Sequence, residues 1–322
     1  MVDRVYGCVA VIDDPFVSAV IDEPFVSEYH TVVVIYSESV RFRAMDEDPY
    51  DALLPERYYD EYGHDEWERL EKTLGGHLEF ESTTDYLDRY LPSSGRVLDA
   101  GGGAGRYSIW LAERGYEVTL VDLSSRQCEL AREKAAEHGV ADRVTVQRGD
   151  LRSLPVESDA FDTVVCTGGP LSHVVDADER ETALRELRRA ARRDAPAFVS
   201  VMGKLAVLQN LVRTPRYHTA VPKLSESGTY TREFARKHVD DPEFTECHFF
   251  RAHELEAALE TAGFDVRTVV GLEGIASNVG ERLELSELDE TAVEAVLETV
   301  RSCRTDPAVV DWSNHILAVA RA

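Results

Sequence analysis

Short apolar runs alternate with amphipathic segments through most of this chain. The runs at 96–99, 117–121, 143–147, 161–166 and 196–202 are bounded by glycine, proline or polar turn residues. Between them, hydrophobic positions recur with the helical period, as expected of helices that pack on a sheet. This alternation predicts an α/β fold in which parallel strands carry helices on both faces.

Two helices are expected before the first strand. One covers 64–74 and ends at Gly75 and Gly76, because paired glycines disfavour a helix. The second begins at a cap formed by Thr83 or Thr84. Together these segments predict an N-terminal helical cover for the domain.

The alternation returns near the end of the chain. A helix, a strand, a second helix and a last strand are expected over 253–262, 265–270, 286–302 and 315–320, respectively. The sheet then contains seven strands. We therefore expect a doubly wound, mostly parallel sheet within one domain over 45–322.

Residues 205–247 interrupt this rhythm. The segment mixes the prolines Pro215, Pro222 and Pro242 with aromatic residues such as Tyr217 and Tyr230. An irregular connection of this length is uncommon in a compact domain unless it has a function of its own. We expect an insertion that forms a lid or a substrate-binding element.

Residues 1–44 differ from the rest of the chain. The sequence VIDDPFVS at 11–18 recurs nine residues later as VIDEPFVS at 20–27. Two copies are too few for a stacked repeat fold, and the prolines disfavour regular strands. We expect a poorly ordered N-terminal extension, either an upstream stretch read before a true start at Met45 or, alternatively, a β-hairpin that docks on the domain.

The chain is strongly acidic. Asp and Glu number 60 against 35 Lys and Arg, which gives a net charge of −25. One interpretation is a protein that repels nucleic acid and acidic membranes. The carboxylates are spread along the whole chain, which favours the other interpretation, a halophilic protein in a high-salt cytoplasm where charges are screened within about 3 Å at 1 M salt.

Cysteine usage and hydropathy agree with a cytoplasmic location. The five cysteines are scattered and form no Cys-x-x-Cys pair, so we expect free thiols and neither a zinc site nor another metal site. No apolar run approaches the roughly 20 residues of a membrane helix. Asp13 and Asp14 interrupt any signal-peptide pattern.

A glycine-rich turn follows the first central strand. Residues 96–106 read RVLDAGGGAGR, which predicts a strand, a turn and the first turn of a helix. Such a turn lets backbone N–H groups approach a ligand closely. The dinucleotide-binding pattern Gly-x-Gly-x-x-Gly fails here, because Arg106 stands at its third glycine. The set observed instead is Asp99, Gly101, Gly103 and Gly105.

Acidic residues follow the next two strands. Asp122 lies 23 positions after Asp99, near the ~20-residue spacing of a carboxylate that binds ribose hydroxyls. Asp150 follows the third strand in the sequence Gly149-Asp150-Leu151. A helix-capping acid and an ordinary loop acid are the structural alternatives for these two positions.

With the segment FDTVVCTGGPL at 161–171, these motifs resemble those of the class I S-adenosylmethionine-dependent methyltransferases. The resemblance is clearest over 58–170 and implies a Rossmann-like fold, a methyltransferase domain and S-adenosylmethionine as cofactor. In that family Asp150 and Leu151 would meet adenine, and Thr167 would lie near the methionine ammonium. The cofactor-binding residues so implied are Asp99, Gly101, Gly103, Gly105, Asp122, Leu123, Asp150, Leu151 and Thr167.

The segment around 57–70 resembles helices that cover the cofactor in relatives. One hypothesis is that Arg69 pairs with the methionine carboxylate, or that Tyr58 or Tyr59 lies over the cofactor. The alternative is ordinary helix packing with a solvated arginine.

The resemblance implies methyl transfer by in-line displacement to an acceptor, which we expect to be a small molecule. His173, Tyr217 and His218 are weak candidates for a catalytic residue, should the acceptor need a base. Alternatives are an RNA or protein methyltransferase and a non-catalytic cofactor-binding protein. A nicotinamide oxidoreductase is disfavoured by Arg106. No basic patch favours nucleic acid and no segment favours a membrane.

Overall fold

A computed structural model describes residues 48–240, 242 and 244–322. The expectations for residues 1–44 lie outside this range. Within it, seven strands form one sheet in the order β3-β2-β1-β4-β5-β9-β8. The strands are β1 (Arg96–Ala100), β2 (Glu117–Asp122), β3 (Val144–Arg148), β4 (Thr163–Cys166), β5 (Pro196–Met202), β8 (Asp265–Gly271) and β9 (His315–Arg321).

The sheet confirms the predicted mostly parallel, doubly wound architecture. Strands β1 to β5 run parallel, whereas β9 is antiparallel to both of its neighbours, β5 and β8. All seven residues of β5 are buried, as expected for a central strand that is covered on both faces. The last strand of the chain therefore lies inside the sheet.

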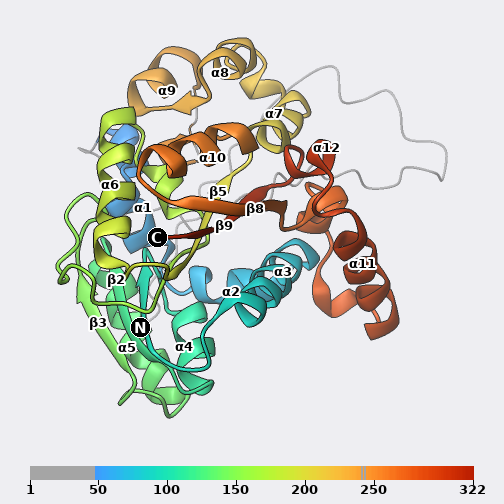
Figure 1. Ribbon diagram of the computed structural model, residues 1–322. Helices are drawn as coiled ribbons and strands as arrows, with labels where there is room; N and C mark the ends of the chain where they lie inside the picture. The colour runs from blue at the N-terminus through green and yellow to red at the C-terminus, as the bar shows by residue number, and fades with distance from the viewer. Residues whose placement is uncertain (1–47, 241, 243) are drawn as a thin grey trace, which may run out of the picture. The chain divides into compact units, whose positions relative to one another are not determined.

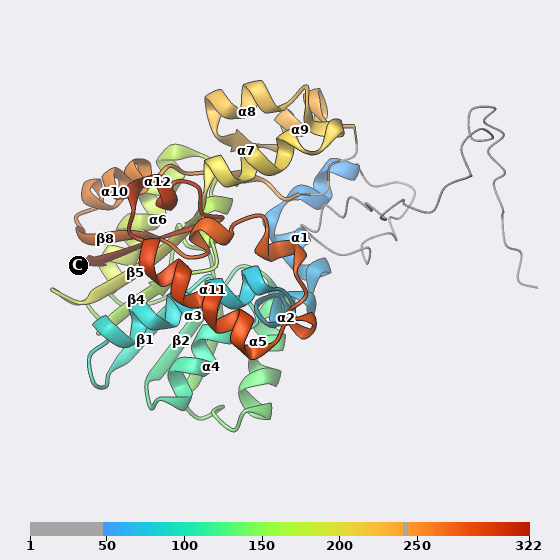
Figure 2. The same cartoon turned by 90° about the vertical axis from the view of Figure 1, so that its right-hand side faces the viewer.

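Helices cover both faces (Figure 1). On one face, apolar residues of α6 (Ala177–Ala190) and α10 (Ala252–Thr261) pack on the sheet. On the other face the covering helices are α2 (Asp65–Lys72), α3 (Leu74–Tyr90), α4 (Arg106–Glu113) and α5 (Ser125–Glu137). Figure 2 shows α11 (Glu290–Cys303) outside α3, which it contacts.

The second predicted helix begins earlier than expected. Helix α3 runs unbroken from Leu74 to Tyr90, and its N-cap is Thr73, whose hydroxyl accepts from the Gly76 N–H at 3.1 Å. The prediction that Gly75 and Gly76 end a helix was wrong. These glycines allow close packing instead, because a Cβ at position 76 would collide with the backbone of Arg69.

The insertion is more regular than its sequence indicates. It contains α7 (Lys204–Val212), η3 (Pro215–Tyr217), α8 (Val221–Ser227), β6 (Thr229–Tyr230), α9 (Arg232–His238) and β7 (Cys247–His248). These elements share an apolar cluster with η1 (Pro49–Leu53), the first described element. The insertion is therefore packed through its own hydrophobic core.

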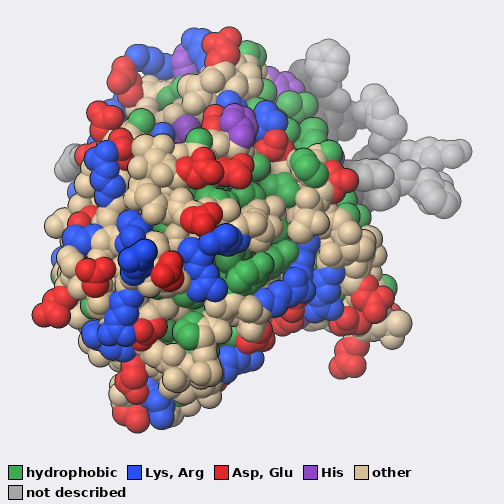
Figure 3. Space-filling view, viewed as in Figure 1, with side chains coloured by type: hydrophobic (Ala, Val, Ile, Leu, Met, Phe, Trp, Pro, Cys, Tyr) green, Lys and Arg blue, Asp and Glu red, His purple; other side chains and the backbone are tan. Residues whose placement is uncertain are grey.

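Acidic and basic side chains are interspersed over the face shown in Figure 3. Many of them are paired at the surface, for example Lys237 with Glu233 at 2.5 Å. Among the described residues, no helix combines the length and the apolar character needed to cross a bilayer.

Candidate functional site

A cavity of about 570 Å³ opens where the parallel strands β1, β2 and β4 end at their carboxyl edge. Ligands of doubly wound sheets bind at this edge, where the strand order reverses. Its volume lies within the range of about 300–1,000 Å³ that is usual for small-molecule sites. The predicted residues that line it are Gly101, Gly103, Asp122, Leu123, Asp150, Leu151, Thr167 and His173.

The turn between β1 and α4 needs its glycines. Gly101 and Gly103 have φ values of +75° and +52°, which L residues with side chains rarely adopt. A Cβ at Gly101 would also collide with the ring of Pro170. Gly105 lies outside the cavity; its φ is +90°, and a Cβ there would come within 3.3 Å of Ala131 on α5.

Asp122 joins two turns at the cavity wall. One carboxylate oxygen accepts from the Gly103 N–H at 2.9 Å, and the other accepts from the Ser124 N–H at 2.9 Å. Burial raises the pKa of this carboxyl, although both backbone donors oppose the shift. The glycine turn and the end of β2 are therefore held in fixed relation by one side chain.

Asp150 carries a partner that the sequence did not indicate. Arg152 Nη2 donates to its carboxylate at 2.5 Å, and the same guanidinium donates to Glu179 at 2.6 Å. The bond from Arg152 lowers the pKa of Asp150. A ligand that uses Asp150 as an acceptor shares this carboxylate with Arg152.

Two buried oxygen atoms near the sheet edge lack a hydrogen-bond partner within the described chain. They are Asp99 Oδ1 and Thr167 Oγ1. Asp99 lies beneath the glycine turn and does not line the cavity; Ser108 donates to its other oxygen at 2.6 Å. Burial raises the pKa of Asp99 to about 6. At this edge of the sheet, Thr167 thus offers the cavity an acceptor for a group that donates a hydrogen bond.

Arg69, on α2, also lines the cavity. Both of its terminal nitrogens donate to the Glu79 carboxylate, at 2.5 and 3.2 Å. Its Nη2 lies 3.8 Å from where a Cβ on Gly168 would be, so the guanidinium adjoins the turn after β4. The cavity therefore has a basic group at the end formed by Thr167 and Gly168.

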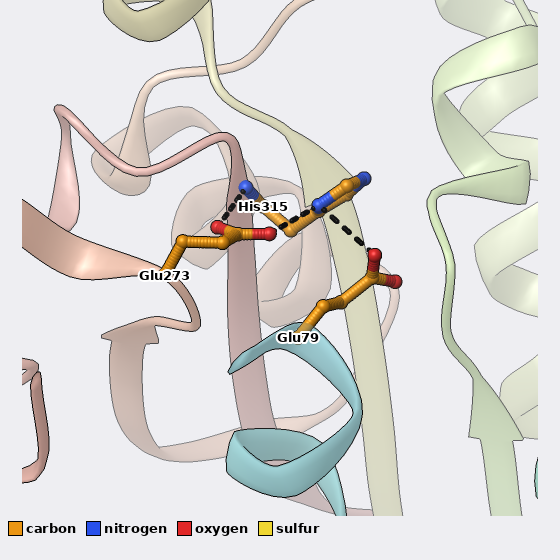
Figure 4. A group of neighbouring side chains, drawn as sticks. All are labelled: Glu79, Glu273 and His315. Atoms are coloured by element: carbon orange, nitrogen blue, oxygen red, sulfur yellow. Dashed lines mark hydrogen bonds and ion pairs between the residues drawn. The ribbon is translucent and has the colours of Figure 1, made fainter. Parts of the chain in front are cut away.

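Glu79 belongs to a buried group of charges that the sequence analysis missed. Figure 4 shows His315, at the start of β9, with its Nδ1 2.6 Å from Glu273 and 3.5 Å from Glu79. Burial opposes protonation of this imidazole, but the two carboxylates outweigh it and raise the pKa of His315 to about 9. No local motif indicates the group, because its members come from distant parts of the sequence.

The same three side chains place possible cation ligands within 4.8 Å of one another. Their charges are already balanced, because Arg69 contacts Glu79 and the imidazolium of His315 contacts Glu273. We therefore treat the group as an ion-pair network rather than as a metal centre.

His173, on η2 (Pro170–His173), also lines the cavity and has a defined tautomer. Its Nδ1 is 2.9 Å from the Glu246 carbonyl oxygen, which can only accept, so Nδ1 carries the proton. Its Nε2 therefore accepts from the Tyr59 hydroxyl at 2.9 Å. Burial lowers the pKa of His173 to about 4, so the imidazole is neutral at physiological pH.

The other acceptor-side candidates lie elsewhere. Tyr217 is buried in the core of the insertion, and the His218 Nε2 contacts the Val212 carbonyl oxygen at 2.8 Å. Neither residue lines the cavity. Of the three candidates, the structure brings only His173 to the cavity wall.

Comparison with known proteins agrees with this geometry. A family model described as a methyltransferase domain matches residues 97–194, the segment with the glycine turn, Asp122, Asp150 and Thr167. The fold is similar to that of a SAM-dependent methyltransferase from Methanosarcina mazei, with a TM-score of 0.52 and 21% identity over 73% of this chain and 96% of that chain. Residues 97–194 are thus similar to methyltransferase domains, and the fold is that of a SAM-dependent methyltransferase. The solved structures of this fold include chains described as SAM-dependent methyltransferases.

Two curated methyltransferases show how far the likeness extends. The chain is 28% identical over 161 residues to methyltransferase GfsG of Streptomyces halstedii, which is 49% of this chain and 54% of that protein. It is 36% identical over 95 residues to the tRNA 5-carboxymethoxyuridine methyltransferase of Escherichia coli K12, which is 28% of this chain and 36% of that protein. The chain thus spans about half, or less, of each relative's length.

The cavity offers groups that fit S-adenosylmethionine chemically. S-adenosylmethionine presents ribose hydroxyls and an ammonium group as donors and a carboxylate as an acceptor. The cavity offers the Asp122 carboxylate and the unpartnered Thr167 oxygen as acceptors, and the Arg69 guanidinium as a donor. The charges and hydrogen-bonding groups of the site therefore match those of the ligand.

Proposed function

We propose that the protein transfers the methyl group of S-adenosylmethionine to a small-molecule acceptor by in-line displacement. The observation that supports this proposal is that donor-side residues and the Tyr59–His173 pair line one cavity. Its volume of about 570 Å³ suits a cofactor together with a small acceptor better than a macromolecular surface.

In this proposal each end of the cofactor has its own residues. Asp122 binds the ribose hydroxyls, and Leu123, Asp150 and Leu151 surround the adenine. Thr167 accepts from the ammonium group, Asp99 supports the same edge from below, and Arg69 donates to the carboxylate. The glycines at 101, 103 and 105 let the backbone approach and the helix pack.

The bound cofactor supplies a methyl group that its sulfonium has already activated. The protein's task is alignment, which can lower a barrier by about 7–11 kcal/mol. Since His173 Nε2 is an acceptor of fixed orientation, it can bind a hydroxyl or amine hydrogen of the acceptor in place of Tyr59. His173 is the catalytic residue that we propose on this side.

We also propose that the insertion closes the acceptor side. Glu246, near the end of the insertion, lines the cavity. Arg232 links it to η1, because its Nη1 lies 3.1 Å from the Asp51 carboxylate and its Nε lies 3.5 Å from the Glu246 carboxylate. Motion of the insertion would therefore move α1 (Pro55–Tyr62), which follows η1 and carries Tyr59. Closure of this kind excludes water and completes a site.

An RNA acceptor is the second candidate. The similarity to a tRNA methyltransferase favours it, whereas the acidic chain opposes binding to phosphates. A high-salt cytoplasm, which we propose as the setting, would screen that repulsion.

Two measurements in high salt test the proposal. Thermal unfolding with S-adenosylhomocysteine or NAD tests the donor site, and stabilisation by the first alone is expected. Turnover with labelled S-adenosylmethionine and a cell extract, divided into small-molecule, RNA and protein fractions, then tests the acceptor class. Label in the small-molecule fraction supports the proposal, whereas label in RNA supports the second candidate. Binding without turnover would show a non-catalytic protein.

A further inference from the structure

The ion-pair network lies directly behind the end of the cavity that Arg69 forms. Glu79 lies on α3, Glu273 follows β8, and His315 begins β9. The His315 ring is 3.9 Å from where a Cβ on Gly169 would be, and Arg69 approaches the neighbouring Gly168 in the same way. The network therefore supports the turn after β4 as well as the guanidinium.

Glu79 is the shared member of the network. Its side chain is 1% exposed and is held between the Arg69 guanidinium on one side and the His315 imidazole on the other. His315 is held in turn by Glu273, which accepts from its Nδ1 at 2.6 Å and its backbone N–H at 2.8 Å. The Ser313 hydroxyl also donates to Glu273, at 2.8 Å. Each buried carboxylate thus has a charged partner and a fixed direction.

We propose that Glu79, Glu273 and His315 are positioning residues that orient the Arg69 guanidinium for the carboxylate of the cofactor's amino-acid arm. This inference rests on the proposed function of the cavity. His315 shares the charge of Glu79, so Arg69, whose Nε also lies 3.6 Å from Glu66, is anchored by Glu79 without being its only counter-ion.

Loss of the His315 charge changes this balance in one direction. Within the network, Arg69 alone would then compensate Glu79. The guanidinium would be drawn toward α3, and the electrostatic potential behind the turn after β4 would become more negative. Both changes weaken the binding of a ligand carboxylate and leave the adenosine end unchanged. The charged and titratable groups that face His315 are Glu79 on α3, Glu273 after β8, Glu281 on η5 (Gly280–Arg282), Arg69 on α2 and His173 on η2 (Pro170–His173).

The decisive variant is His315→Asn, because the asparagine amide can replace Nδ1–H as a donor to Glu273 but carries no charge. Calorimetry at pH 7.5 compares two ligands, S-adenosylhomocysteine and 5′-methylthioadenosine, which lacks the amino-acid arm. We expect His315→Asn to bind S-adenosylhomocysteine about tenfold more weakly and 5′-methylthioadenosine as tightly as the unchanged protein. His138→Asn is the matched control, since His138 pairs with Glu113 at 3.0 Å on the exposed surface.

The pH profile separates orientation from ordinary structural damage. Affinity of the unchanged protein for S-adenosylhomocysteine should fall more steeply than that of His315→Asn as the pH rises through about 9, because His315 loses its proton there in addition to the ligand's own ammonium group. Glu273→Gln should move the fall to lower pH, because it removes one of the carboxylates that stabilise the imidazolium.

Equal weakening of both ligands, or identical pH profiles in the unchanged protein and His315→Asn, would overturn the inference. Failure of the unchanged protein to bind S-adenosylhomocysteine would instead overturn the proposed function. If His315→Asn does not fold, the shift of the pH profile in Glu273→Gln still decides the question.

Discussion

Asp122 and Gly103, which meet at one end of the cavity, are 19 positions apart in the chain and lie on adjacent turns. At the other end, Glu79 and His315 come from opposite parts of the described chain and meet because β9 enters the sheet between β5 and β8. The proposed adenosine end is thus made by local motifs, whereas the Arg69 anchor of the proposed methionine end is made by tertiary packing. Local sequence motifs can therefore predict one part of a site, whereas the other part becomes visible only in the folded structure.

The largest effect is expected from Asp122→Ala, which tests the end of the cavity where Asp122 and Gly103 meet. It removes the acceptor of two backbone N–H groups and the proposed ribose ligand, so affinity for S-adenosylhomocysteine should fall about 100-fold. Binding of 5′-methylthioadenosine should fall equally, because this ligand keeps the ribose. Calorimetry measures both values, and loss of S-adenosylhomocysteine binding alone would contradict the division into two ends.

The methionine end should affect stability as well as binding. The pKa of His315 is raised from 6.5 to about 9, so its contribution to stability is fully present below pH 6.5 and is lost as the pH rises through 9. A shift of this size corresponds to about 3 kcal/mol of unfolding free energy. Denaturant unfolding between pH 6 and 10 measures it. If the unfolding free energy changes with pH in the same way in the unchanged protein and in His315→Asn, the network does not contribute this pH dependence.

Arg69→Lys tests the contact with the ligand at the same end. Lysine keeps the charge near Glu79 but lacks the planar fork that can bind two carboxylates. We expect affinity for S-adenosylhomocysteine to fall about tenfold while 5′-methylthioadenosine binds unchanged. The ratio of the two dissociation constants is the measurement. An unchanged ratio would show that Arg69 does not bind the ligand carboxylate and has only a helix-packing role.

The smallest effect is expected at Arg152. Arg152→Gln releases the Asp150 carboxylate from its ion pair, so the acceptor for adenine becomes more available. We expect both ligands to bind about two- to fivefold more tightly, because surface ion pairs contribute about 0–1 kcal/mol. Weaker binding of both would show that Arg152 holds Asp150 in place for the ligand.

The sequence predicted what short-range patterns can encode. All seven strands of the sheet appear near their predicted positions, because buried strands bounded by turns leave a periodic signal. The glycine-rich turn could also be predicted from the sequence, because Gly101 and Gly103 have positive φ angles and a Cβ at Gly101 would collide with Pro170.

The features that escaped prediction depend on long-range contacts. The glycines at 75 and 76 indicated a helix end, but the proximity of Arg69 to position 76 and of Glu281 to position 75 gives them a packing role inside α3. The partner of Arg69 could not be inferred either, because nothing near Glu79 distinguishes it from a solvated acid. Burial of Glu79 at 1% exposure is the signal, and only the folded chain provides it.

The position of β9 has a consequence for how the protein is made. During synthesis, β1 to β5 can leave the ribosome and pair with one another before β9 does. These strands find their partners among themselves, and only β5 also pairs with β9. Until β9 inserts between β5 and β8, Glu273 lacks the imidazolium that balances it, and Glu79 has only Arg69 as its cation in this network. The end of the cavity formed by Asp122 and Gly103 would thus be ordered before the Arg69 end, which is complete only once β9 has inserted.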